Sequence, residues 1–179
     1  MNKLKEEYNK KLRESIRKEL NLSNIYSVPT LSKIVVNSGV SSAISNPDSL
    51  NETRDILKAI TGQLPLTTKA KYSISNFHLR KGMNIGLKVT MRNERMWDFY
   101  EKLNEIVFPR FRDFRGLPKT SFDKKGNYTI GISEHTVFSE VAQMYIDRVK
   151  SLQITIVTTA NDDKSAEVLL RTLGLPLEK

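Results

Sequence analysis

The sequence has no cysteine and no apolar run long enough to cross a bilayer. The first absence excludes disulfides, thiolate zinc sites and cysteine nucleophiles. The N-terminal residues have no apolar signal core, and the acidic Glu6 and Glu7 argue against an organellar transit peptide. With 39 % hydrophobic and 27 % charged residues, the 179-residue chain is expected to be a cytoplasmic protein without membrane contact.

Motifs for catalysis, cofactors and metals are also missing. There is no P-loop and no serine in a Gly-x-Ser-x-Gly elbow. The two histidines, His78 and His135, stand far apart and lack partners at metal-ligand spacing. Carboxylates such as Glu94 and Asp98 lie beside basic residues, as helix-surface ion pairs do. We therefore expect no catalytic residue, no metal and no cofactor, which disfavours an RNA-processing enzyme.

Acidic residues are missing from one long segment. Residues 62–92 contain none, and their six basic residues contribute +6 to the formal net charge of +9. A second segment, residues 108–128, carries six basic residues against Asp113 and Asp123, and the rest of the chain sums to −1. Because each neutralised phosphate releases counterions, charge gathered in this way favours a polyanionic partner. A solvated basic surface is the alternative interpretation.

Helical and strand patterns are interspersed along the chain. Apolar residues at steps of four predict a helix over residues 2–20, and further helices are expected from Ser45–Asp48 to Gly62, from the capping residue Asn93 to Val107, and from Asp162 or Asp163. Strands are expected at residues 31–37, 64–68, 85–92, 128–132 and 153–159. Since the strands are amphipathic, the sequence predicts an α+β fold. Its mostly antiparallel sheet has helices on one face, an open RNA-binding face and long basic loops.

We expect a single domain over residues 1–179, with a basic arm at 69–84 and a long basic loop at 108–127. A loop of this length inside a compact domain is usually functional or mobile.

The strand at residues 85–92 provides the first candidate binding residues. Its apolar side chains alternate with Lys88, Thr90 and Arg92, so the three polar side chains share one face. Asn37 is expected to emerge near the same surface, beside cations and hydroxyls that suit RNA. Equally, Asn37 fits a turn before Ser38, and strand propensity alone explains Thr90.

Aromatic residues accompany both basic segments. Phe77 and His78, near the middle of the arm, are candidates for stacking on nucleobases, although core packing is the alternative for Phe77. In the long loop, arginines interleave with Phe108, Phe111 and Phe114. That pattern fits an RNA-binding loop or a docking surface for an acidic protein equally well.

Many stretches, in order along nearly the whole chain, resemble the bacterial large-subunit ribosomal protein five family. They are Leu31–Val40, Ile60–Pro65, Lys69–Phe77, Leu79–Gly86, Pro109–Arg110, Arg112–Gly116, Ser121–Asp123, Gly126–Thr129, Thr158–Ala160 and Leu173–Pro176.

The resemblance implies a non-enzymatic constituent of the large ribosomal subunit. Such a protein binds 5S rRNA and helps attach it in the central protuberance, contacts P-site tRNA, and contributes an intersubunit bridge to a small-subunit head protein. Large-subunit rRNA and other 5S-associated ribosomal proteins are further implied partners, and the protein is implied to be a monomer within the ribosome. An RNA chaperone or assembly factor on the same scaffold is the alternative.

The resemblance also implies roles for individual residues. The positions facing 5S rRNA are Asn37, Gln63 and Thr90, with Lys88 and Arg92 as neighbours of phosphates. The arm that approaches rRNA and tRNA comprises Lys69, Lys71, Ser73, Asn76, Phe77, His78, Arg80 and Lys81. The bridge loop comprises Arg110, Arg112, Arg115, Lys119, Lys124 and Lys125.

Three stretches depart from the family pattern. Ser139 replaces a usual proline, Ala142–Met144 replaces an Asp-Tyr-Asp-like run, and Ser151–Gln153 replaces Gly-Leu-Asp. These changes remove acidic groups and turn-formers near the expected bridge side and put the bridge geometry in question. We hypothesise that Lys124 and Lys125 compensate by making the loop more basic.

Overall fold

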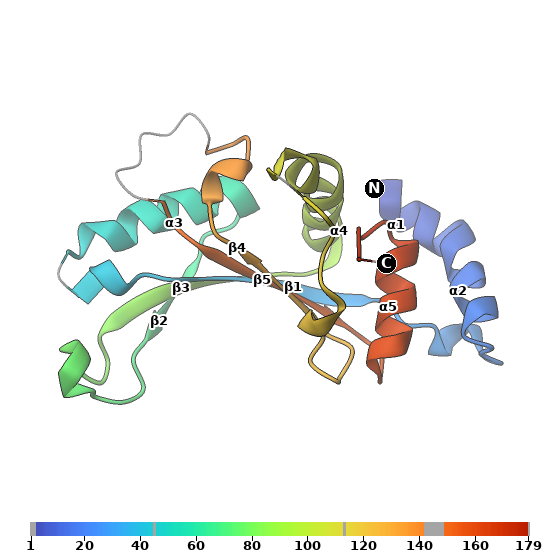
Figure 1. Cartoon of the computed structure of the whole chain (residues 1–179), viewed down its shortest axis with the longest axis horizontal. Helices are drawn as coiled ribbons and strands as arrows, with labels where there is room; N and C mark the ends of the chain where they lie inside the picture. Colours follow the sequence, from blue (N-terminus) through green and yellow to red (C-terminus); the bar gives the residue numbers. More distant parts are fainter. Residues whose placement is uncertain (1–2, 45, 113, 142–148, 179) are drawn as a thin grey trace. The chain divides into compact units, whose positions relative to one another are not determined.

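The structure is a computed structural model that describes residues 3–44, 46–112, 114–141 and 149–178. It contains a five-stranded antiparallel sheet with the strand order β2-β3-β1-β5-β4 (Figure 1). The strands are β1 (Leu31–Gly39), β2 (Leu66–Lys69), β3 (Asn84–Met91), β4 (Tyr128–Ile132) and β5 (Leu152–Thr158). The predicted α+β class with an antiparallel sheet is confirmed.

The chain forms two compact units. Unit 1 contains Met1–Ile34, Met91–Ile130 and Thr155–Lys179, and unit 2 contains Val35–Thr90 and Gly131–Ile154. Short 3₁₀ segments connect the main elements: η2 (Ile25–Ser27), η3 (Ser41–Ile44), η4 (Ser75–Phe77), η6 (Phe108–Arg110), η7 (Lys119–Ser121) and η8 (His135–Val137).

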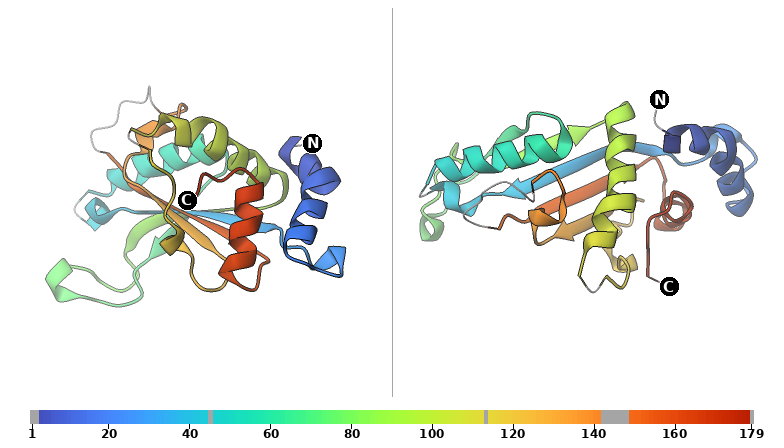
Figure 2. Two further views of the ribbon diagram at one scale, coloured as in Figure 1. Left: turned by 45° about the vertical axis from the view of Figure 1, so that its right-hand side comes forward. Right: turned by 90° about the horizontal axis from the view of Figure 1, so that it is seen from above.

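In unit 2, the helix α3 (Asp48–Thr61) lies along one side of the strands (Figures 1 and 2). Its apolar stripe, Ile56, Leu57 and Ile60, is fully buried. Pro47 stands at the N-cap, and Gly62 ends the helix in the left-handed conformation (φ +65°), where its N–H donates to Lys58 O at 2.9 Å. The helix and its glycine stop agree with the sequence pattern, although Ser45, part of the expected start, lies outside the described residues.

The antiparallel pair β2–β3 fixes which side chains share a face of unit 2. Leu66 lies opposite Lys88, and Thr68 lies opposite Gly86. Directly paired residues of neighbouring strands project to the same side of a sheet. The expected strand 64–68 begins two residues late, because Pro65 has no N–H to donate to the ladder.

In unit 1, the N-terminal helical segment comprises α1 (Lys3–Glu7), the π-helical turn η1 (Tyr8–Leu12) and α2 (Arg13–Glu19). Residues spaced by four drift about 40° per step around an α-helix. A wider π turn counteracts this drift, so Tyr8 and Ile16 both stay buried. Tyr8 packs against Trp97 with ring centroids 5.5 Å apart, and its hydroxyl donates to Pro29 O at 2.8 Å.

Two further helical segments complete unit 1: α4 (Asn93–Lys102), which continues into the π-helical η5 (Leu103–Val107), and α5 (Asp163–Thr172). Asp162 caps α5 by accepting a hydrogen bond from Ser165 N, as predicted. The predicted capping role of Asn93 is wrong. Arg92 is the N-cap residue, and Asn93 is the first helical residue with a left-handed φ of +53°.

Candidate nucleic-acid interface

The side of the β1 and β3 segments in unit 2 that faces away from the buried core is polar. Val36, Leu87 and Val89 are buried, and between them Lys88 is exposed and Asn37 and Thr90 are half-buried. We call Asn37, Lys88 and Thr90, together with the adjacent Gln63, the polar sheet face. Strand β1 continues to Gly39, so the alternative interpretation of Asn37 as a turn residue is wrong.

Gln63 joins this face through the turn that follows α3. The left-handed Gly62 reverses the chain, and the Thr61 hydroxyl donates to Gln63 O at 3.2 Å. The Gln63 amide then donates to Thr90 O at 3.4 Å. The structure therefore brings together Gln63 and Thr90, which are 27 residues apart in the sequence.

Gly86, two residues before Lys88 in β3, has no room for a side chain on this face. A Cβ atom on Gly86 would lie 2.8 Å from Ser38 O and 2.9 Å from Thr68 Oγ1, closer than such atoms approach in proteins. Only glycine fits here without displacement of β1 or β2. Leu66, opposite Lys88, is 71 % exposed and adds an apolar side chain that the sequence interpretation missed.

A shallow hollow of about 410 Å³ opens beside Asn37. Its lining comes from the ends of β1 and β4 and from the start of β5: Asn37, Gly39, Gly131, Ile132, Ser133, Ser151, Leu152 and Gln153. The departures at Ser151 and Gln153 therefore lie beside Asn37. The alternation of β5, with Leu152 and Ile154 buried and Gln153 exposed, is the sequence signal that could have identified Gln153.

The arm is a closed hairpin that extends the β2–β3 pair. Ala70 N donates to Met83 O at 2.8 Å, and an isolated antiparallel bridge joins Ile74 to Leu79 near the tip. The Ser73 hydroxyl accepts a hydrogen bond from Lys81 N at 2.9 Å, which ties the two sides together. All eight candidate residues of the arm are exposed: Lys69, Lys71, Ser73, Asn76, Phe77, His78, Arg80 and Lys81.

Two aromatic rings of the arm face solvent. Phe77 is 68 % exposed, which rules out core packing as its role. Tyr72, which the sequence interpretation missed, is 77 % exposed. Exposed rings beside cations are a typical arrangement for stacking on unpaired bases.

Arg92 and the bridge-loop candidates belong to unit 1. Arg92 is exposed at the N-cap of α4, and the six loop cations Arg110, Arg112, Arg115, Lys119, Lys124 and Lys125 are also exposed. Lys119 is partly neutralised because its Nζ lies 3.3 Å from Glu167 Oε1.

The aromatic residues of the bridge loop pack on one another. Ring centroids of Phe108, Phe111 and Phe114 lie 5.7–6.3 Å apart, and Phe108 is buried. The three rings therefore form a cluster within the loop, and the loop arginines and lysines are exposed around it. Farther along, Asp123 holds a tight turn by accepting hydrogen bonds from Asn127, and these bonds lower the pKa of its carboxyl group.

Two family models match this chain over almost all of the residues that carry these features. The model described as ribosomal protein L5 matches residues 24–80, and the model for the C-terminal part of the same ribosomal family matches residues 84–177. The chain belongs to the ribosomal protein L5 family. It is accordingly a non-enzymatic structural constituent of the large ribosomal subunit and associates with rRNA and ribosomal proteins.

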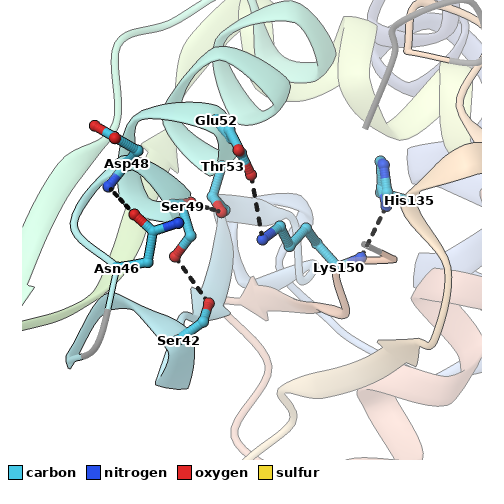
Figure 3. Close-up of polar contacts among 8 residues, drawn as sticks. All are labelled: Ser42, Asn46, Asp48, Ser49, Glu52, Thr53, His135 and Lys150. Carbon is cyan, nitrogen blue, oxygen red and sulfur yellow. Dashed lines mark hydrogen bonds and ion pairs between the residues drawn. The ribbon is translucent and has the colours of Figure 1, made fainter. Parts of the chain in front are cut away.

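In this L5 family member, His135 is part of the packed interior and not of the exposed basic surface. It is buried, and its Nδ1 accepts a hydrogen bond from Lys150 N at 3.0 Å (Figure 3). Burial is the main reason that its pKa is lowered, and the nearby Lys150 ammonium lowers it further. Lys150 also forms an ion pair, Nζ to Oε2 at 3.6 Å, with Glu52 of α3.

Nothing in the described part of this L5 family member points to a metal or a membrane. Within residues 3–44, 46–112, 114–141 and 149–178, no three potential metal-ligating side chains gather. In the same ranges, every helix is too short or too polar to span a bilayer. Of the departures from the family pattern, Ser139 is exposed and donates to Glu140 Oε2, whereas Ala142–Met144 lie outside the described residues.

Proposed function

We propose that the polar sheet face binds 5S rRNA and thereby helps to attach it in the central protuberance. The observation that carries this proposal is the gathering of Asn37, Gln63, Lys88 and Thr90 on the side of unit 2 opposite its buried core. Membership of the L5 family supplies the ribosomal context.

The chemistry of the face divides into positioning and reading. Lys88 carries a charge that attracts any phosphate backbone, so it positions the RNA without regard to sequence. Asn37, Gln63 and Thr90 are neutral donors and acceptors that hydrogen-bond 2′-hydroxyls and base edges. Because the Gln63 amide is held beside Thr90, these two groups meet the RNA at one place. We include Arg92 as a further phosphate contact.

The arm is proposed to contact large-subunit rRNA and P-site tRNA. Its exposed cations suit phosphates, and the rings of Phe77 and Tyr72 suit stacking on bases that are not paired. The closed hairpin keeps these side chains at the end of a defined extension.

The bridge loop is proposed to contribute an intersubunit bridge to a small-subunit head protein. Its phenylalanines pack on one another, so the exposed cations are the groups available to an acidic partner surface. The family pattern and this charge support the assignment.

Filter binding of the purified protein across a salt series tests the 5S proposal. The probes are 5S rRNA, a tRNA and a scrambled RNA of equal length. Lys88→Ala should weaken binding to every RNA and reduce the salt slope by about one unit. Lys58→Ala removes a charge from α3 that is also exposed, and it should leave both the affinity and the salt slope nearly unchanged.

Thr90→Val and Asn37→Ala should instead reduce only the preference for 5S rRNA, by about 0.5–1.5 kcal/mol for each lost hydrogen bond. Equal affinity of the wild type for all three RNAs would contradict the proposal and favour the RNA chaperone. An equal loss for every RNA in all variants would refute the division into positioning and reading residues.

A further inference from the structure

The hollow beside Asn37 differs from the rest of the basic surface, because none of its eight lining residues carries a charge. Its polar groups are the amides of Asn37 and Gln153, the hydroxyls of Ser133 and Ser151, and the backbone of the strand ends. A phosphate would find no cation here. Neutral amides, which both donate and accept, match the edge of a nucleobase.

The size and the position of the hollow also favour a nucleobase as its ligand. A volume of about 410 Å³ falls in the range of small-ligand sites, about 300–1,000 Å³. Asn37 belongs to both the hollow and the polar sheet face, so the hollow adjoins the face that is proposed to bind RNA. Bases that are not paired can be turned out of an RNA strand and read on their Watson–Crick edges.

The lining of the hollow includes two glycines, Gly39 and Gly131. A Cβ atom built on Gly39 or Gly131 meets nothing within 4 Å, and neither residue has a left-handed φ. The space above these glycines is therefore open, and the backbone itself does not require glycine at either position. This contrasts with Gly86, where contacts with β1 and β2 leave no room.

We infer that the hollow receives one unpaired nucleobase of the bound RNA and reads it through Asn37 and Gln153. The inference rests on the proposed binding of 5S rRNA by the adjoining polar sheet face. Gln153 then acts as a specificity residue, whereas Lys88 only positions the backbone. The Ser38 hydroxyl, which donates to Ser151 O at 2.9 Å, fixes the start of β5 and so the rim of the hollow.

Chemical probing of 5S rRNA with the full-length protein tests this inference. Dimethyl sulfate and a carbodiimide together modify the Watson–Crick edges of all four unpaired bases. The wild type should protect one such base that regains reactivity in both Gln153→Ala and Gly131→Val, while the remaining protections persist. Gln153→Ala should weaken 5S binding about two- to tenfold without changing the salt slope.

Gly131→Val adds a side chain to the lining of the hollow, at a position where a Cβ atom meets nothing within 4 Å. Thr67→Val on β2 serves as the matched control that should behave like the wild type. If the wild type binds 5S rRNA specifically but both hollow variants keep every protection, the inference is overturned and the proposed function stands. If the wild type shows no preference for 5S rRNA, both are overturned.

Discussion

Gly86→Ala should destabilise the protein by a mechanism that the structure specifies. The new Cβ would lie 2.8 Å from Ser38 O and 2.9 Å from Thr68 Oγ1, and the first of these is a backbone atom that cannot rotate away. Forcing one extra carbon into a packed site costs about 1–3 kcal/mol. In a chain of this size, each kcal/mol corresponds to a melting temperature lower by about 2–4 °C. Urea unfolding followed by circular dichroism measures the change in the midpoint and in the slope.

Two comparisons decide whether the close contacts of the new Cβ atom cause the loss of stability in Gly86→Ala. Gly131→Ala also adds a methyl group to a strand, but into open space, and should be neutral or stabilising by up to about 1 kcal/mol. Thr68→Ala in the Gly86→Ala background removes one of the two close contacts and should restore only part of the stability. If Gly86→Ala were as stable as Gly131→Ala, the steric argument would be refuted.

Three further predictions concern other parts of the chain. Because the pKa of His135 is lowered in the folded state, stability should fall as the pH drops below 6.5. His135→Gln should abolish that part of the pH dependence, as urea midpoints at several pH values would reveal. Asp162→Ala removes the cap of α5 and should cost about 1 kcal/mol in thermal unfolding, whereas loss of the exposed Asp55 should cost far less. Reversing the charge of both Lys124 and Lys125 should weaken subunit association, measured by sedimentation, and unchanged association would refute their proposed role in the bridge loop.

The elements that local chemistry determines could be predicted from the sequence. Alternation in β3 placed Lys88 and Thr90 opposite the buried Leu87 and Val89, because side chains of a strand point alternately to its two faces. Asp162 and Gly62 marked helix ends for similarly local reasons, namely a side-chain cap and a left-handed backbone.

Features that depend on tertiary pairing could not be predicted. Strand β1 runs past Asn37 because the chain beyond it still pairs with β3, as the bond from Val40 N to Ile85 O shows. The hollow combines Asn37 and Gly39 with residues 131–133 and 151–153, and no local pattern indicates that these three segments adjoin. The π turn at Tyr8–Leu12 reflects the burial of Tyr8 against Trp97, which lies in a distant helix.

The register of the sheet links the fold of unit 2 to its proposed RNA contact. A slip of one residue between paired strands would turn every side chain of the moving strand to the other face. In β3, such a slip would bury Lys88 and Thr90 and expose Leu87 and Val89. Because Gly86 has no side chain, the Ser38 carbonyl of β1 can approach β3 closely at this position. A slip of β3 would place a residue with a Cβ atom at this contact, so Gly86 disfavours the slipped register. Replacements at Gly86 that the protein survives should therefore impair RNA binding as well as stability, even though glycine offers no side chain to the RNA.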